Sequence, residues 1–327
     1  MLEQSQSNDT RCRICGKAAA RRVGEVEYFI GYRFAVYDCA ACGCRFTPHD
    51  AGAYEAMYAE ENSCYRRYAV NAQRCQAAFA RGDLAGLAAA LSFSSRYRFI
   101  IEAAERVSPG ARFLEIGCSR GHLTSYLLLA GRDVTGVDVS PSALAAARAA
   151  FGDHFLAAGD PRIAAQAPYD VIYHVGTIGC LADPVGMTRD LLRLLKPGGQ
   201  LLFNAPNRDS LLWPGQLWID SAPPPDLVTL FPPGFWRDVL GGTARVRERI
   251  EYYPAGQSIQ LALQRLLRRW QAPQPMPLGG KARADRPPAF ADRLERWAAR
   301  VAAVAKFDRL LPPRPTEFGL FVEITGT

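Results

Sequence analysis

The sequence has no long hydrophobic run, and none of its apolar stretches approaches the ~20 residues that a membrane-spanning helix needs. Its first nine residues offer neither a basic start nor an apolar stretch, so no secretory signal is visible. No internal repeat is evident either. We therefore expect a protein without a membrane segment, located in the cytoplasm.

Basic charge is not spread evenly along the chain. The formal net charge is +7, from 39 Lys and Arg against 32 Asp and Glu. Residues 1–60 hold seven basic and eight acidic side chains, whereas residues 259–327 hold twelve and six. Because the excess lies in one C-terminal segment, a solvated helical face or a lid over an acidic ligand explains it as well as RNA does.

Two C-x-x-C knuckles stand near the N-terminus, separated by 23 residues. Each knuckle places two thiolates on one tight turn, and two turns supply the tetrahedral ligand set that Zn²⁺ requires. We predict a closed structural zinc site without a catalytic role, and Cys44 is a fifth thiol that could replace Cys42. A disulfide pair is the competing interpretation for a chain outside the cytoplasm. The predicted ligands are Cys12, Cys15, Cys39 and Cys42.

A glycine turn follows the strand predicted at residues 113–116, although the full G-x-G-x-x-G dinucleotide fingerprint is absent. Gly117 and Gly121 let the backbone turn sharply and come close to a ligand, an approach that a Cβ would block. The helix predicted at residues 122–130 places its unpaired N–H groups beside that ligand. The turn is therefore a candidate binding site for a nucleotide-like molecule.

A second predicted strand, residues 133–138, also ends in a carboxylate. Asp138 stands 23 residues after Glu115, and an acid at about this distance from the glycine turn holds a ribose diol in βαβ units. The alternative role, a helix cap, is already filled by Ser140 followed by proline. Asp138 is therefore a candidate ribose ligand.

Helices and strands alternate after Asp138. The expected order is a helix at 142–150, the segment 155–160, a strand at 169–174, a helix that ends within 194–199, and a strand at 200–204. In this order and spacing, the run LEIGCSRG…GVDVS…AAGD…YDVIYHV…LLRLLKPGGQLLFNAPN resembles the class I S-adenosylmethionine-dependent methyltransferases over residues 107–207. The resemblance implies an α/β fold with a Rossmann-like, seven-stranded methyltransferase sheet, to which the chain adds an N-terminal zinc ribbon and a C-terminal helical insertion.

The same resemblance implies S-adenosylmethionine as the cofactor and S-adenosylhomocysteine as the product. Asp138 would hold the ribose hydroxyls, Asp160 would hold the adenine amino group, and the glycine turn would line the methionine and ribose portions. The complete set implied for the cofactor is Glu115, Gly117, Cys118, Ser119, Gly121, Asp138, Val139, Gly159, Asp160, His174 and Val175.

The segment after the strand at 169–174 is where this family commonly places groups that face the substrate. Many relatives have a Glu-His pair a few residues before an Asp-Pro, but this sequence has Gly-Cys at 179–180 before its Asp-Pro at 183–184. The departure removes an obvious acid or base. His174 is then the candidate catalytic base, because an imidazole titrates near neutral pH. A hydrogen-bonded histidine beside the cofactor is the alternative interpretation.

Several aromatic residues have two possible roles. By the resemblance, the connector before the sheet covers the cleft, and some of its side chains line the substrate pocket; packing between ribbon and sheet is the alternative. Later aromatic residues either contact a ring or sugar of the acceptor or fill the core of a loop. The connector candidates are Tyr54, Tyr58, Tyr65, Arg66 and Tyr68, and the later ones are Trp213, Trp218 and Phe231.

The chain is long enough for one large core and an additional small module. We predict five parts: a zinc ribbon (1–50), a helical connector or cleft cover (51–105), the methyltransferase domain (106–258), a basic helical insertion (259–315) and the final strand of the sheet (316–327). The insertion could be a lid, a dimer contact or a polyanion-binding arm.

The predicted reaction is an in-line methyl transfer, in which the protein aligns the acceptor and excludes water. We expect a small-molecule acceptor, a sugar or natural-product intermediate, because the ribbon arrangement looks like that of such enzymes and the ribbon is not basic. An RNA base methyltransferase, which predicts a basic ribbon face and salt-dependent binding, is the first alternative. A non-catalytic zinc-stabilised scaffold is the second. The acceptor atom and the oligomeric state stay open.

Overall fold

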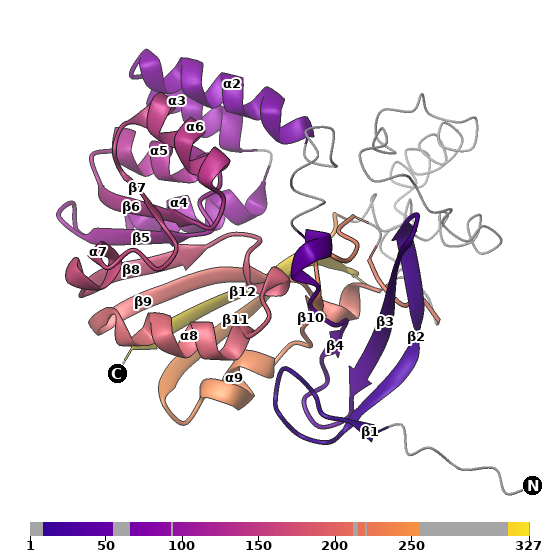
Figure 1. The fold of residues 1–327 in the computed structure, drawn as a ribbon. Helices are drawn as coiled ribbons and strands as arrows, with labels where there is room; N and C mark the ends of the chain where they lie inside the picture. The colour runs from indigo at the N-terminus through magenta and orange to yellow at the C-terminus, as the bar shows by residue number, and fades with distance from the viewer. Residues whose placement is uncertain are drawn as a thin grey trace, which may run out of the picture.

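The computed structural model describes residues 9–54, 66–92, 94–211, 215–219, 221–254 and 313–326. Two β-sheets organise these residues, a large one with helices on both faces and a smaller one at the N-terminal side (Figure 1). In the part of the chain so described, no helix is both long and apolar enough to cross a membrane.

The large sheet has seven strands in the order β11-β12-β9-β8-β5-β6-β7. Strands β5 to β9 are mutually parallel, and β12 runs antiparallel to both of its neighbours, β9 and β11. The predicted Rossmann-like, seven-stranded α/β sheet is therefore confirmed. The strands are β5 (Arg112–Ile116), β6 (Asp133–Asp138), β7 (Phe155–Ala157), β8 (Tyr169–His174), β9 (Leu195–Ala205), β11 (Ala244–Tyr252) and β12 (Pro315–Gly326).

Apolar side chains cover both faces of this sheet, as a parallel sheet between two helical layers requires. Because successive side chains of a strand point to opposite faces, neighbouring residues join different clusters. Phe113 and Tyr173 belong to the cluster under the first helical layer, and Leu114 and Ile172 belong to the cluster on the other face. The central strands are thus buried on both sides.

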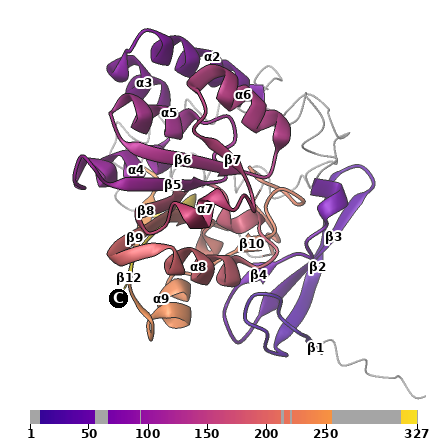
Figure 2. The same ribbon diagram turned by 60° about the vertical axis from the view of Figure 1, so that its left-hand side comes forward.

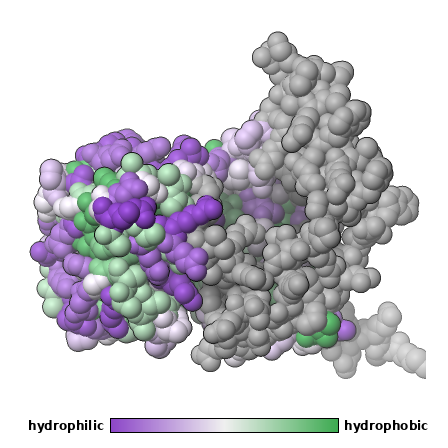
Figure 3. Space-filling view, turned by 90° about the horizontal axis from the view of Figure 1, so that it is seen from above, coloured by the Kyte–Doolittle hydropathy of each residue, from purple (hydrophilic) through white to green (hydrophobic). Residues whose placement is uncertain are grey.

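Helices form one layer on each face of the sheet (Figures 1 and 2). On one face, α2 (Arg66–Ala80), α3 (Leu84–Leu91) and α4 (Ser95–Glu105) pack around α5 (His122–Leu129), with α6 (Pro141–Phe151) beside them. The other face carries α8 (Pro184–Arg193) and α9 (Phe235–Leu240), and the short α7 (Arg162–Ala165) precedes β8. Seen from above, the first layer shows hydrophilic residues with apolar ones between them, as expected of a solvent-facing surface (Figure 3).

The smaller sheet, which we call the N-terminal sheet, has the order β1-β2-β3-β4-β10. Its hairpin of β2 and β3 turns at Gly31, which has a φ of 85°. The last strand comes from much later in the chain and pairs antiparallel with β4, so a segment that follows the large sheet's β9 completes the N-terminal sheet. The strands are β1 (Asp9–Thr10), β2 (Ala20–Phe29), β3 (Tyr32–Cys39), β4 (Arg45–Phe46) and β10 (Thr229–Leu230).

One element boundary differs from the sequence-based expectation. The helix expected to end within residues 194–199 ends at Arg193, and β9 begins at Leu195. Tyr169 pairs with Leu195 and Val171 with Gln200, so the intervening residues bulge out of the ladder. Pro197 has no N–H to donate and Gly198 has a φ of 76°, which explains why this stretch is an irregular start of a strand.

Some predicted features lie outside the described residues, among them Tyr58, Tyr65, Trp213 and the side chains of Arg66 and Tyr68. The basic insertion, 259–315, does so apart from its last three residues, and Pro315 already belongs to β12. The boundaries of the five parts stay predictions. Trp218 and Phe231 are fully buried within hydrophobic clusters, which favours a packing role for both.

Candidate functional site

The glycine turn after β5 lies where the strand order changes direction. β5 has β6 on one side and β8 on the other, and open α/β sheets bind ligands at the carboxyl ends of strands at such a switch point. Gly117 and Gly121 have φ of 73° and 74°. The amides of Gly117 and Cys118 both donate to Val137 O, at 2.7 and 3.0 Å. The turn is thereby fixed against the end of β6.

The two glycines are required for a reason that the sequence did not reveal. A Cβ at Gly117 would lie 2.4 Å from Thr177 Oγ1, and one at Gly121 would lie 2.5 Å from the Phe155 ring. The expected obstacle was a ligand, but the obstacle in the structure is the protein's own packing. Thr177, which follows β8, is therefore in contact with the turn, and its Oγ1 donates to Ile116 O at 3.2 Å.

Asp138 ends β6 beside the turn and is held by two backbone amides. Ser119 N donates to its Oδ2 at 2.7 Å, and Ser140 N donates to its Oδ1 at 2.8 Å. Ser119 has a φ of 50°, an uncommon value for a residue with a side chain. Ser140 caps α6 by accepting from Ala143 N at 3.3 Å, so Asp138 is not needed as the cap. Its carboxylate is an oriented acceptor at the crevice.

The residues after Asp138 and after β7 complete this edge of the sheet. Val139 is 71% exposed, an unusual state for a large apolar side chain. Asp160 accepts from Arg162 Nη2 at 2.8 Å, and the hydrogen bonds from Arg162 lower the pKa of this carboxyl. A flat apolar group that packed on Val139 would lie near the ionised carboxylate of Asp160, at the same edge of the sheet.

Glu115 lies under the turn rather than in the crevice. Its Oε2 accepts from Tyr173 OH at 3.0 Å and from Thr124 Oγ1, and the residue is 4% exposed. Burial raises its pKa to about 7. Sequence analysis found Glu115 but missed its partners, Tyr173 and Thr124, because nothing in their spacing links them to it.

His174 is completely buried on the opposite side of the sheet from Tyr173. Its ring stacks on Phe203 with centroids 4.6 Å apart, and among the described residues neither ring nitrogen has a hydrogen-bond partner. Burial lowers its pKa to about 3. A neutral imidazole that faces Phe203 is a poor proton acceptor for a substrate, so the geometry counts against the predicted base and against a cofactor contact by this side chain. Phe203 in turn contacts Trp236 of α9.

Two further members of the predicted cofactor set have side chains in the core. Cys118 is buried against Gly136, with Sγ 3.0 Å from the position of an added Cβ. Val175 packs against the same cluster from the end of β8. Either residue could therefore contact a ligand only through its backbone or an edge of its side chain.

The loop after β8 has no space for the missing Glu-His pair. A Cβ at Gly179 would lie 2.3 Å from Leu227 Cδ1 and 2.5 Å from Pro206 Cγ. Cys180 Sγ lies 3.4 Å from Gly176 O and 3.9 Å from Asp226 Oδ1. The segment around Leu227 thus occupies the region into which larger side chains at 179 would extend.

The four predicted zinc ligands come together. The Sγ atoms of the cluster all lie within 4.8 Å of one another. Cys12 and Cys42 are separated by 3.9 Å and Cys15 and Cys39 by 3.7 Å, close to the roughly 3.8 Å edge of a tetrahedron with ~2.3 Å Zn–S bonds. The donor set fits zinc, and Cys44, although buried nearby, is not among the four. We call Cys12, Cys15, Cys39 and Cys42 the thiol cluster.

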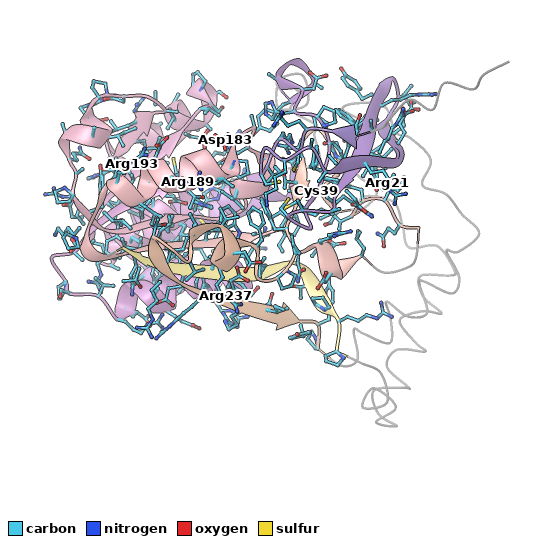
Figure 4. All side chains as sticks on the ribbon, turned by 90° about the horizontal axis from the view of Figure 1, so that it is seen from below. Arg21, Cys39, Asp183, Arg189, Arg193 and Arg237 are labelled. Atoms are coloured by element: carbon cyan, nitrogen blue, oxygen red, sulfur yellow. The ribbon has the colours of Figure 1, made fainter. Side chains whose placement is uncertain are left out.

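A surface pocket of about 450 Å³ opens beside the thiol cluster. Its lining includes the two partly exposed thiols, Cys15 and Cys42, together with Lys17 and, from α8, Arg189. Figure 4 shows α8 with its Asp183 end toward Cys39 and its Arg193 end farther away. The helices α8 and α9, which cover one face of the large sheet, both line this pocket beside the cluster.

Comparisons with known proteins place the central segment in a family. A family model described as "Methyltransferase domain" matches residues 114–201. The ubiquinone biosynthesis O-methyltransferase of Proteus mirabilis is 31% identical over 129 residues, which is 36% of this chain and 51% of that protein. The protein of the same name from Pseudomonas putida is 34% identical over 117 residues, 32% of this chain and 49% of that protein. The chain therefore spans about half the length of these curated relatives.

Solved structures show weaker likenesses. A SAM-dependent methyltransferase from Archaeoglobus fulgidus has a TM-score of 0.42 at 17% identity, covering 71% of this chain and 92% of that one. Coclaurine N-methyltransferase has a TM-score of 0.42 at 12% identity, covering 71% and 70%. We base the fold on the strand order and not on these scores. By its sheet, its glycine turn and the matched residues, the chain contains a class I S-adenosylmethionine-dependent methyltransferase domain.

Proposed function

We propose that this protein transfers a methyl group from S-adenosylmethionine to a small-molecule acceptor, a sugar or natural-product intermediate. The observation that carries the proposal is the fixed carboxylate of Asp138 beside the positive-φ turn 117–121, at the switch point of the sheet. A carboxylate held by two backbone amides keeps lone pairs free for a vicinal diol.

In this proposal, Asp138 accepts hydrogen bonds from the ribose hydroxyls, and the exposed side chain of Val139 lies against the adenine ring. Asp160, close to Gly159, accepts from the adenine amino group. The backbone of residues 117–121 approaches the methionine and ribose portions. Glu115 supports the turn from below through Thr124 and does not itself bind the cofactor.

The acceptor class rests on charge. Two exposed arginines of the N-terminal hairpin are paired with acids: Arg22 with Glu25 at 2.8 Å, and Arg33 with Glu27 at 3.0 Å. Paired charges give little net attraction for a polyanion. The names of the curated relatives also describe O-methylation of a small molecule. We infer the same broad class here and not the same substrate.

When bound, the cofactor supplies an activated methyl carbon. The protein has to bind and orient the acceptor and to shield the reacting atoms from water. The crevice at the carboxyl ends of β5, β6 and β8 would hold the acceptor in line with the transferred carbon. A hydroxyl acceptor requires a base, whereas an amine or thiolate hardly needs one. Because His174 faces Phe203, the proposal assigns no base to this side chain.

We further propose that the thiol cluster binds one structural zinc ion. Its four thiolates would close the coordination sphere, leaving no position for a substrate, so the metal would stabilise the N-terminal sheet without taking part in the reaction. Cys15 and Cys42 reach the adjoining pocket, through which the ion can enter.

The test is incubation of the purified protein with S-adenosylmethionine carrying a labelled methyl group and an extract of the source organism. We expect label in a small-molecule fraction that nucleases do not affect. Label in nuclease-sensitive material would overturn the acceptor class and favour RNA. No label in any fraction, together with no binding of S-adenosylhomocysteine, would overturn the proposed activity.

Two aspartates of one strand provide a matched pair for the cofactor assignment. Asp138→Ala removes the acceptor at the crevice, and we expect affinity for S-adenosylhomocysteine to fall about 100-fold, as for the loss of charged hydrogen bonds. Asp133→Ala, at the far end of β6, removes an exposed ion pair with Arg112 and should leave the affinity unchanged. Equal affinities of the two variants would contradict the ribose assignment.

A further inference from the structure

Arg13 lies between the two cysteines of the first knuckle, and all five of its N–H donors are used. Nε donates to Thr47 O at 3.0 Å, and Nη1 donates to Leu181 O at 3.0 Å and to Ala182 O at 2.8 Å. Nη2 donates to Val228 O at 2.7 Å and to the Thr229 hydroxyl. A guanidinium has five donors in a fixed plane, so this side chain is fully committed to three separate segments.

These three segments also bond to one another. Val228 N donates to Gly179 O at 2.8 Å, and Thr47 N donates to Val228 O at 3.0 Å. Arg13 therefore closes a network that joins the end of β4, the loop after β8 and the start of β10. Its acceptors Leu181 and Ala182 lie in the loop that follows β8 of the large sheet, whereas Arg13 itself lies in a turn of the thiol cluster.

The charge of Arg13 has no carboxylate partner. Within the described part of the chain, no acidic side chain lies within ion-pair distance of its guanidinium, whereas Arg45, at the same junction, contacts Asp38 at 2.7 Å. The groups that interact with Arg13 electrostatically are the thiols of Cys12 and Cys44 and, beyond ion-pair distance, the carboxylate of Asp183. The contacts that orient Arg13 are therefore its hydrogen bonds to backbone carbonyls and to the Thr229 hydroxyl.

The loop that Arg13 holds reaches the glycine turn at its other end. Gly176 N donates to Asn204 Oδ1 at 3.0 Å, and Thr177 contacts the turn through Ile116 O and through the space beside Gly117. Only a few residues separate Thr177 from Leu181. A shift of residues 181–182 would therefore be transmitted to the cofactor-binding turn through a short, continuous series of contacts.

We propose that Arg13 is a positioning residue that fixes the loop 177–182 against the cofactor-binding turn through its hydrogen bonds. The N-terminal sheet thereby helps to shape the cofactor site although none of its residues was assigned to that site. This inference rests on the proposed function, since it concerns the site that binds S-adenosylmethionine.

The experiment compares Arg13→Met, Arg13→Lys and a matched control, Arg11→Met, in the full chain. Arg11 precedes the same knuckle, and its hydrogen bond among the described residues is a local one, to Gly16 O at 2.7 Å. For each protein we would measure zinc content, amide hydrogen exchange by residue, and the dissociation constant of S-adenosylhomocysteine. The affinity is measured on fully folded protein. If Arg13 only stabilised the fold, its replacement would leave this affinity unchanged, so a change in affinity indicates a positioning role.

For Arg13→Met we expect zinc at the wild-type level, exchange at the Thr47 and Val228 amides faster by about tenfold, and a dissociation constant higher by about fivefold. Arg13→Lys keeps the positive charge but loses the planar set of guanidinium donors. Its exchange rates and dissociation constant should therefore lie between those of Arg13→Met and wild type. Arg11→Met should match wild type in all three measurements.

Wild-type exchange at Thr47 and Val228 together with wild-type affinity in Arg13→Met would overturn the proposal. So would loss of zinc with fast exchange throughout the hairpin of β2 and β3, because Arg13 would then hold the N-terminal sheet together rather than the loop. A wild-type protein that does not bind S-adenosylhomocysteine would instead refute the proposed function, and the exchange data would still decide whether Arg13 fixes the loop.

Discussion

The two sheets of this protein are stabilised in different ways. The seven-stranded sheet is buried on both faces by large, continuous apolar clusters under its two helical layers. The N-terminal sheet has a much smaller cluster of its own, centred on Val36 and Trp218, and joins one of the large clusters through residues such as Ala20 and Phe46. A module with so little core of its own needs further sources of stability. We propose that the thiol cluster, with zinc bound, is one of them, and arginine hydrogen bonds at the junction are another.

The junction between the sheets contains polar contacts beside this shared apolar cluster. Arg45 binds the Asp38 carboxylate with two donors and also donates to Gln216 O at 2.8 Å. Arg208, from the large sheet's side, contacts Asp38 at 3.2 Å and donates to Gly43 O. Arg13 adds five further bonds. Directional hydrogen bonds to backbone carbonyls therefore supplement the apolar contacts that the N-terminal sheet makes with the large sheet, and they fix geometry more strictly than those contacts do.

The largest expected effect is a loss of stability in the N-terminal sheet, but not in the large sheet, when the metal is removed. Cys39→Ser should abolish zinc binding, whose apparent free energy in small zinc modules is about 10–16 kcal/mol. We expect amides of β2 and β3 to lose their protection from hydrogen exchange while those of β5 and β8 keep it. Cys44→Ser is the matched control, because this buried thiol lies outside the cluster.

If Cys44→Ser also lost zinc, the ligand set would be wrong. If both sheets lost protection together in Cys39→Ser, the two regions would form one cooperative unit and the contrast between them would not hold. Absence of zinc from the purified wild type would remove the basis of the comparison altogether.

The next effect tests how tightly the large sheet is packed at its glycine turn. Gly121→Ala should destabilise the protein by about 4 kcal/mol, because it combines a left-handed φ with a Cβ 2.5 Å from Phe155. Gly131→Ala has nearly the same φ and nothing within 4 Å of the added atom, so it should cost about 1 kcal/mol. Urea denaturation measures both, and equal losses would show that the contact with Phe155 carries no energy.

The sequence predicts the large sheet well because its signals are local. Apolar strands such as residues 113–116 and 169–174 run directly into a glycine turn or a polar loop, and an acid ends the strand at 133–138. The thiol spacing likewise predicted which four cysteines meet. In each case, a short stretch of sequence contains both the element and the residue that ends it.

The rest depends on contacts between distant segments. β10 has two residues and lies in a proline-rich stretch, so nothing in its own sequence marks it as a partner of β4. Arg13 resembles an ordinary surface residue until Leu181 and Val228 are known to lie beside it. The surroundings of His174 could not be predicted for the same reason, since Phe203 is its neighbour only in the folded sheet.

A smaller effect is the pH dependence of the stability that Glu115 causes on one face of the large sheet. Burial raises the folded-state pKa of Glu115 to about 7, from 4.5. Between these values the unfolded chain releases its proton while the folded chain keeps it, so stability falls by about 3 kcal/mol as pH rises through this window and levels off above it. Glu115→Gln cannot ionise and should lack this component in a pH series of urea denaturations. Parallel curves for variant and wild type would show that Glu115 is ionised in the folded protein.

The smallest expected effect comes from the opposite face, at His174. Phenylalanine would keep the stacking on Phe203 and remove two buried ring nitrogens that have no partner among the described residues. We therefore expect His174→Phe to raise the free energy of unfolding by about 1 kcal/mol and to leave the methyl-transfer rate within about twofold of wild type, because a buried imidazole with a pKa of about 3 contributes no proton transfer near neutral pH. A folded variant whose rate fell about 100-fold would restore the catalytic base. It would also show that the face of the sheet beside α9 takes part in the reaction.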